Sequence, residues 1–300
     1  MSGDGEETVR ESDMFRAAKA GNAAKVRRLI AAGADVNEVN SCGRTVLMEA
    51  VTSGDRSLKA VRLLVEAGAD ALRIDRFGNN LLHEAVDAPV RGDDIEELFP
   101  YLCSLGIAVD AKSKSGSTPL SRAVHGGMAL EVRVLCALGA DPNQTAMLGE
   151  SAEPVGPYFE RPMLFHATIF ADSPNKVAAL LDAGADPLAV DERGRTPLVF
   201  AIQTLYGGWS SAEPKEKAKE FVAALRAMSG CDTDRIRALV DELMLSASPE
   251  YRQDKPRAKR FEWECDLDVR RLIREESTES IKLLAVAEKR ARMARGEWVV

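Results

Sequence analysis

One short pattern returns along the first part of the chain: an apolar helix end, a glycine, an Ala-Asp pair and an extended segment. It reads "AAGADVNEVN" from Ala31, "EAGADALRID" from Glu66, "ALGADPNQTA" from Ala137 and "DAGADPLAVD" from Asp182. The turn glycines Gly33, Gly68, Gly106, Gly139 and Gly184 are 35, 38, 33 and 45 residues apart. A period of this size is one supersecondary unit, so we expect a stack of similar repeats with variable insertions.

Helical signatures lie on both sides of these turns. The segments "VRRLI" at Val26, "VRLLV" at Val61, "VRVLC" at Val132 and "VAALL" at Val177 precede the glycines, with apolar residues spaced as on one helix face. After the turns come "GRTVLMEAV" at Gly43, "GNNLLHEAV" at Gly78, "GSTPLSRAV" at Gly116 and "GRTPLVFAI" at Gly194. A threonine can cap a helix and a proline fits its first turn, so each repeat is predicted to hold two helices.

Together the two signatures resemble the ankyrin repeat, a β-turn followed by two antiparallel helices. The resemblance covers Ser12 to about Asp232 in six repeats, which begin near Ser12, Asn40, Asp75, Lys112, Thr145 and Asp191. It implies an all-α ankyrin-repeat solenoid with short β-turn or hairpin tips, because one helix pair alone cannot bury its apolar faces. We expect residues 1–11 to be a disordered acidic N-terminus, residues 12–232 the array and residues 233–300 a C-terminal helical extension.

The C-terminal extension carries no repeat signature. The segment "TDRIRALVDELMLS" predicts an amphipathic helix with Thr233 or Asp234 as its N-cap, and helical periodicity resumes at Leu267, with a break near Ser277. Basic residues gather between Lys255 and Arg260 and between Lys289 and Arg295. We interpret them as a solvated face of a cap on repeat six; docking of a partner helix and self-association are the alternatives.

Composition and motifs narrow the function classes. A net charge of -7 argues against nucleic acid and anionic membranes as partners, and no apolar run approaches the roughly 20 residues that span a bilayer. Five cysteines without a C-x-x-C pair favour reduced thiols over disulfides or a zinc site, which suits a cytoplasmic protein. The sequence has no nucleophile elbow, phosphate loop or dinucleotide fingerprint. We therefore expect no catalytic residues, no cofactor, no metal and no small-molecule substrate.

Insertions depart from the regular repeat. The connection between repeats four and five is 11 residues longer than the others and carries Tyr158 and Phe159, and the insert in repeat six carries Tyr206 and Trp209. Such aromatic side chains either anchor a bound protein or pack back on their own helices. Repeat three is also longer; it places Pro100 inside its second helix and acidic residues near the start of that helix.

The resemblance implies a protein-protein interaction module, such as a scaffold, an adaptor, or an inhibitor or antidote of a toxin or enzyme. Its partner, expected to be basic, would contact the concave face and the insertions. The predicted contact residues are Met48, Glu49, His83, Glu84, Ser121, Arg122, Tyr158, Phe159, Phe165, Val199, Tyr206 and Trp209. For His83 a structural bond to the backbone of a neighbouring repeat is the competing interpretation. The alternative function is an array that targets a small C-terminal helical effector or nucleic-acid-binding segment.

Overall fold

The computed structural model describes residues 12–53, 57–88, 92–147, 160–168, 173–207, 223–225, 231–246 and 267–297. The chain divides into two compact units. Unit 1 comprises Met1–Ala123 and Ala137–Ala140, and unit 2 comprises Val124–Cys136 and Asp141–Val300. The boundary passes through two helices, α7 (Pro119–His125) and α8 (Ala129–Ala137). The C-terminal helices thus fold in one unit with repeats five and six, while a domain boundary at residue 232 stays a prediction.

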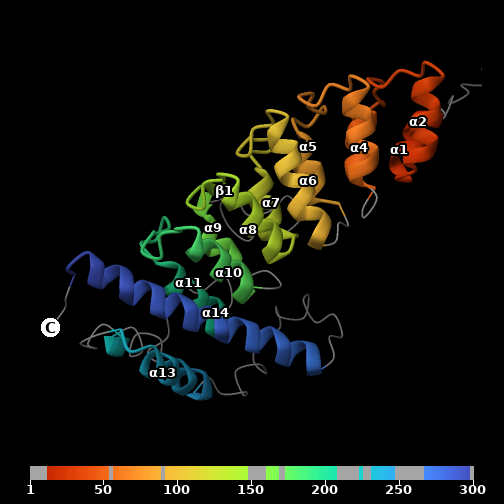
Figure 1. Cartoon of the computed structure of the whole chain (residues 1–300). Helices are drawn as coiled ribbons and strands as arrows, with labels where there is room; N and C mark the ends of the chain where they lie inside the picture. The colour runs from red at the N-terminus through yellow and green to blue at the C-terminus, as the bar shows by residue number, and fades with distance from the viewer. Residues whose placement is uncertain are drawn as a thin grey trace, which may run out of the picture. The chain divides into compact units, whose positions relative to one another are not determined.

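Unit 1 consists of successive helix pairs. They are α1 (Asp13–Lys19) with α2 (Ala23–Ala31), α3 (Val46–Val51) with α4 (Ser57–Glu66), and α5 (Leu81–Val86) with α6 (Gly92–Ser104). The first helices of neighbouring pairs pack together, α1 on α3 and α3 on α5, and so do the second helices, α2 on α4 and α4 on α6. Figure 1 shows these helices standing side by side. The expected all-α repeat architecture is confirmed, with Pro100 inside α6 as predicted.

Local chemistry explains where these helices begin and end. The side chains of Ser12 and Thr45 accept hydrogen bonds from the backbone N–H groups of Phe15 and Met48, which satisfies donors that a helix start leaves open. At the far end of α2, Gly33 has a φ of 81°, and the N–H groups of Gly33 and Ala34 donate to Ile30 and Leu29. All five turn glycines adopt positive φ, as the repeated sequence predicted.

Unit 2 adds a two-stranded hairpin to its helices. Strands β1 (Thr145–Met147) and β2 (Glu160–Pro162) are antiparallel, and Ala146 pairs with Arg161. Helices α9 (Met163–Ala167), α10 (Ser173–Asp182) and α11 (Pro197–Gly207) follow, and α9 packs against both α10 and α11. Helices α13 (Thr233–Ser246) and α14 (Leu267–Ala294) complete the unit and lie side by side.

Helix α14 packs on repeats five and six in the way that a second helix packs on its neighbours. It packs against α10 and α11, as α4 packs against α2 and α3. Its end repeats the turn of the earlier second helices: Gly296 has a φ of 69° and its N–H donates to Met293, as Gly184 donates to Leu181. A buried stripe of Ile281, Leu284, Ala285 and Glu288 follows helical spacing. The C-terminal helix is therefore packed into the same unit as repeats five and six.

Two details of the predicted C-terminal helices need correction. The N-cap of α13 is Asp232, not Thr233 or Asp234, because its carboxylate accepts from the N–H groups of Asp234 (3.0 Å) and Arg235 (3.1 Å). Helix α14 runs through Ser277 without a break, since its packing on α10 and α11 outweighs local propensity.

The basic run at the end of α14 is not a uniformly solvated face. Lys289 is buried and its Nζ donates to the carbonyl oxygen of Leu225 at 3.0 Å. Arg292 pairs with Glu288, and Arg295, which is half-exposed, pairs with Asp186. The other basic run, 255–260, lies outside the described residues.

Candidate functional site

The structure places the predicted contact residues in three groups. Six of them are buried: Met48, Glu49, His83, Glu84, Ser121 and Phe165. Val199 and Arg122 are partly exposed. Tyr158, Phe159 and Trp209 lie outside the described residues, and Tyr206 belongs to α11 without a described side chain. Residues without exposed surface, such as Met48 and Phe165, hold the helix pairs together, so a direct contact with a partner stays a prediction for them.

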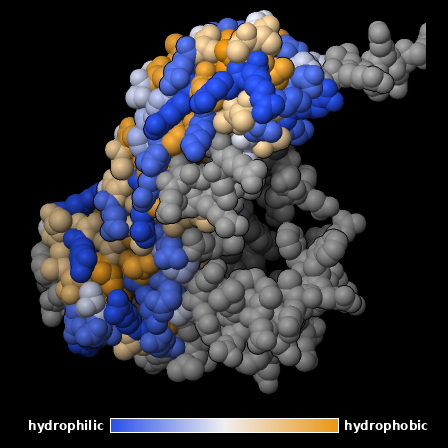
Figure 2. Space-filling model, turned by 45° about the vertical axis from the view of Figure 1, so that its right-hand side comes forward, coloured by the Kyte–Doolittle hydropathy of each residue, from blue (hydrophilic) through white to orange (hydrophobic). Residues whose placement is uncertain are grey.

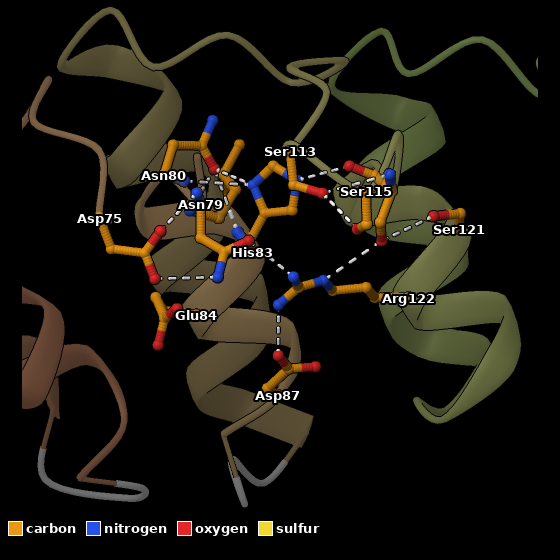
Figure 3. Close-up of polar contacts among 12 residues, drawn as sticks. Asp75, Asn79, Asn80, His83, Glu84, Asp87, Ser113, Ser115, Ser121 and Arg122 are labelled. Atoms are coloured by element: carbon orange, nitrogen blue, oxygen red, sulfur yellow. Dashed lines mark hydrogen bonds and ion pairs between the residues drawn. The ribbon is translucent and has the colours of Figure 1, made fainter. Parts of the chain in front are cut away.

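A polar cluster organises the start of α5 (Figure 3). Asp75 is buried, and its carboxylate accepts hydrogen bonds from the N–H groups of Phe77 and Asn79, both 2.8 Å long, and from the side-chain amide of Asn79. Asn80 then caps α5: its Oδ1 accepts from the N–H groups of Leu82 and His83, both at 3.1 Å. These short-range bonds fix the conformation of the turn and the direction in which α5 begins.

His83 joins this turn to the next one. Its Nε2 lies 2.9 Å from the carbonyl oxygen of Ser117, and its Nδ1 lies 3.2 Å from the N–H of Asn80. A carbonyl only accepts, so Nε2 carries a proton and donates to Ser117. Burial lowers the pKa of His83 below its ordinary value. The predicted bond from His83 to a neighbouring repeat is therefore confirmed.

Arg44 links repeats two and three. Its Nε donates to Glu49 Oε1 at 2.8 Å, and its Nη1 forms an ion pair with Glu84. The side chain of Glu84 is only 4% exposed, and burial raises the pKa of its carboxyl although Arg44 opposes the shift. One guanidinium thus holds two predicted contact residues in a fixed arrangement.

Arg122 links repeats three and four in a similar way (Figure 3). Its Nη1 lies 2.5 Å from Asp87 Oδ2, its Nη2 donates to Asn79 Oδ1 at 2.6 Å, and its Nε donates to Ser117 Oγ at 3.3 Å. The side chain of Asp87 is 53% exposed and that of Arg122 is 20% exposed. This pair therefore combines an ordered geometry with access from solvent.

We call the groups Arg44, Glu49, Glu84, Asp87 and Arg122 the ion-pair row. The sequence prediction had included Glu49, Glu84 and Arg122, and the structure brings these three into the row. It had missed Arg44 and Asp87. Arg44 precedes the helix cap Thr45, and Asn79, Ser117 and Arg195 occupy the corresponding place and also form side-chain bonds. Alignment of that one position would have found Arg44.

The row offers charges that are fixed in place. Charge-assisted hydrogen bonds already hold its members in one conformation. Asp87 and Arg122 therefore lose little side-chain entropy when a partner binds them. Within the described ranges, no three His, Cys, Asp or Glu residues gather in a way that could hold a metal ion. The arrangement suits recognition of a complementary charged surface.

Unit 2 has its own ordered cluster beside the hairpin. The Phe165 ring lies 5.4 Å from that of Phe200, and the guanidinium groups of Arg161 and Arg195 each lie 5.0 Å from the Phe200 ring centroid. Arg195 pairs with the buried Asp191 at 2.6 Å. Phe165, a predicted contact residue, thus belongs to an aromatic-cationic stack inside unit 2.

Comparison with known proteins agrees with the repeat fold. The family model described as ankyrin repeats (3 copies) matches residues 14–112. The inactive serine/threonine-protein kinase TEX14 of Bos taurus is 32% identical over 145 residues, 48% of this chain and 8% of that protein. The mitochondrial disaggregase of Homo sapiens is 30% identical over 227 residues, 70% of this chain and 28% of that protein. The chain therefore spans less than a third of either curated relative.

Solved structures extend the similarity in fold. The ankyrin repeat domain of Bcl-3, a member of the IkappaB protein family, matches with a TM-score of 0.50 at 22% sequence identity. The match covers 80% of this chain and 87% of that one. Among the described residues, no helix is both long enough and apolar enough to cross a membrane.

Proposed function

The chain is built of ankyrin repeats, and on this premise we propose that it is a non-catalytic module that binds a protein partner. The observation that carries the proposal is the ion-pair row, which fixes partly exposed charges across repeats two, three and four. Stacked repeats form an extended surface that suits recognition of another protein. Scaffold, adaptor and inhibitor or antidote of a toxin or enzyme are the roles that this module would fill, in the cytoplasm.

Charge and order support the choice of a protein partner. Arg122 and Asp87 are held in one geometry and still reach solvent, which lowers the entropy lost on association. The chain carries a net charge of -7, which favours a basic partner over most of its surface. The packing of α14 on α10 and α11 makes the C-terminal helix part of the repeat stack, which favours the binding module over a separate C-terminal effector.

The test is affinity purification of the full chain from its native cell, followed by mass spectrometry. Three baits are compared with the unmodified chain: the Asp87→Ala/Arg122→Ala variant, a chain lacking residues 149–160, and Arg133→Ala as a matched control on the exposed side of α8. We expect a stoichiometric protein that the Asp87→Ala/Arg122→Ala variant loses and the Arg133→Ala variant keeps. Loss on deletion of 149–160 would add Tyr158 and Phe159 to the contact. Recovery of no protein, or of nucleic acid alone, would overturn the proposal.

A further inference from the structure

Helix α5 ends with a charged residue, whereas α3 and α9 end with a hydroxyl group. The C-caps of α3 and α9 are Thr52 and Thr168. Their hydroxyls donate to the carbonyl oxygens of Glu49 at 3.0 Å and Phe165 at 2.8 Å. The C-cap of α5 is Asp87, whose carboxylate cannot donate to a carbonyl and opposes the helix dipole at this end. Capping therefore does not explain Asp87, and a break of a local rule is typical of a functional position.

Asp87 is also the most exposed member of the ion-pair row. Its side chain is 53% exposed, whereas those of the other four members are between 4% and 24% exposed. Arg122 binds Oδ2 of Asp87, and Oδ1 has no partner among the residues that the structure describes. Hydrophilic side chains are common on the face in Figure 2, so exposure alone does not single out this oxygen. Its fixed position does.

Arg122 holds Asp87 from the neighbouring repeat. Besides its contact with Asp87, its Nη2 donates to Asn79 Oδ1 at 2.6 Å and its Nε donates to Ser117 Oγ at 3.3 Å. A planar guanidinium with three such partners keeps one orientation, so Asp87 Oδ1 is fixed in place before any partner arrives. Figure 3 shows Arg122 reaching from α7 to the end of α5. Arg122 is therefore a positioning residue for Asp87.

Carboxyl groups outnumber guanidinium groups around α5 among the described residues. Asp75, Glu84 and Asp87 lie on or beside this helix, and after burial the charges of Asp75 and Asp87 also raise the pKa of Glu84. Glu49 adds a fourth carboxyl group, and the ion-pair row brings two guanidinium groups against these four. Exposed Arg76 belongs to the turn before α5, at the helix end opposite Asp87. The surroundings of Asp87 therefore favour a cation.

We propose that Asp87 accepts a lysine or arginine side chain of the protein partner, and that Arg122 positions Asp87 for this contact. The inference rests on the proposed function and names the chemistry of the partner at the ion-pair row. A partner cation would donate a charge-assisted hydrogen bond to Oδ1 and lie beside the surplus of carboxyl groups. An anionic group would be repelled by the same surplus, and Arg122 already donates to three acceptors.

The binding test uses a fluorescein-labelled peptide of alternating Arg and Gly, with fluorescence anisotropy measured on the full chain. A second peptide carries Glu in place of Arg. We expect the Arg-Gly peptide to bind the wild type, and Asp87→Asn to weaken this binding by about three- to five-fold. The Glu-Gly peptide should bind neither chain. Rising salt should weaken binding of the Arg-Gly peptide to the wild type.

Asp182 of unit 2 provides a matched control. It is the exposed last residue of α10, so Asp182→Asn makes the same change of charge at another helix end. This variant should bind the Arg-Gly peptide as the wild type does. General attraction to a chain with a net charge of -7 would instead weaken binding equally in the two variants.

A second substitution at Asp87 distinguishes binding from folding. Asp87→Thr supplies the hydroxyl that Thr52 and Thr168 donate to their own helices, so this variant should be at least as stable as Asp87→Asn in urea unfolding. It still lacks the carboxylate, so it should bind the Arg-Gly peptide as weakly as Asp87→Asn does. Wild-type affinity in Asp87→Thr would show that the charge of Asp87 is not the contact.

Arg122→Lys tests the positioning role, because lysine keeps the positive charge and loses the forked donors. It should weaken binding of the Arg-Gly peptide to the otherwise unmodified chain. In the Asp87→Asn background it should have little further effect, since its contribution passes through Asp87. Equal effects in the two backgrounds would show that Arg122 does not act through Asp87.

Three results of the peptide experiment would overturn the inference: no binding by the wild type, undiminished binding by Asp87→Asn, or an equal loss in Asp182→Asn. The affinity purification adds a test on the native partner. A partner that Asp87→Ala/Arg122→Ala loses and Asp87→Thr keeps removes this inference and leaves the proposed function intact. Recovery of no native protein removes the proposed function itself.

Discussion

The Nε2 atom of His125 lies 2.9 Å from the Nδ1 atom of His166 inside unit 2. Nε2 of His166 faces the carbonyl oxygens of Ala146 at 3.0 Å and Arg161 at 3.2 Å, so it carries that ring's proton. Its Nδ1 must then accept the proton of His125. The hydrogen bonds therefore require His166 to be neutral and His125 to carry a proton on Nε2, and they tie β1 and β2 to the end of α7.

This pair predicts an acid-sensitive unit 2. Burial and then the charge of Lys176 lower the pKa of His125 to about 4, and burial and then the charge of His125 lower that of His166 to about 3. Both pKa values lie below the ordinary 6.5, so the unfolded chain binds more protons. The contribution of this pair to the free energy of unfolding should be fully present above pH 6.5 and fall as pH drops towards 3. One pKa unit is about 1.4 kcal/mol, so His125 alone accounts for about 3 kcal/mol.

The measurement is urea unfolding between pH 6.5 and 5, where carboxyl groups of ordinary pKa stay ionised. The His125→Gln variant keeps a side-chain donor and removes the titration, so its unfolding free energy should depend less steeply on pH. An unchanged slope in this variant would contradict the assignment of the pH dependence to the pair.

Replacing Arg44 should lower the stability of the fold far more than replacing an exposed arginine. Arg44→Met leaves the carboxylate of Glu84 buried without its cation, which should lower the free energy of unfolding by about 3–5 kcal/mol. Arg16→Met breaks a pair with Asp13 whose side chains are 61% and 58% exposed, and should change it by less than about 1 kcal/mol. In urea unfolding, adding Glu84→Gln to Arg44→Met should recover part of the loss. Equal effects of the two single variants would show that Arg44 contributes no more than a surface pair.

Alanine substitutions at two glycines of unit 1 distinguish the effect of an unfavourable backbone conformation from the effect of a steric clash. Gly78 and Gly116 both have a φ of 80°, so alanine at either position adopts an unfavourable conformation, at about 1–2 kcal/mol. A Cβ at Gly78 would lie 3.0 Å from the backbone nitrogen of Lys114, whereas one at Gly116 meets nothing within 4 Å. Gly78→Ala should therefore be the less stable variant by about 1 kcal/mol or more in thermal unfolding. Equal stabilities would mean that the turn of Lys114 moves freely.

Because α14 packs against α10 and α11, substitutions in its buried stripe should strongly destabilise unit 2. Leu284 is fully buried, so Leu284→Ala should destabilise unit 2 by about 2–5 kcal/mol. The adjacent Leu283 is only partly buried, and Leu283→Ala serves as the matched control, with a smaller expected loss. Hydrogen exchange should then show faster exchange in α10 and α11 for Leu284→Ala alone. Unaltered exchange in these helices would contradict the view that α14 is packed on repeats five and six.

Part of the candidate site could be anticipated from contiguous residues. The bond of His83 to a neighbouring repeat followed from the resemblance of its position to the ankyrin motif. Glu49, Glu84 and Arg122 were predicted as neighbours of the motif position after the leucine, and the structure places them in ion pairs. Their ion-pair partners could not be predicted, because Arg44 and Glu84 are 40 residues apart and the sequence pattern contains no distances. The inward direction of Asp75 was equally hidden, since "RIDRF" looks like an ordinary mixture of charges.

The sequence by itself determined the helix pairs and their turns. A capping Thr45, an apolar stripe and a glycine such as Gly33 that adopts positive φ act within a few residues, so they can be read from the chain. Only the tertiary structure decided that α14 packs on α10 and α11. The bond from Thr196 to Glu288 joins residues 92 positions apart and depends on which helix buries its apolar face against α10 and α11. Packing of distant surfaces, unlike capping, is a property of the whole folded unit.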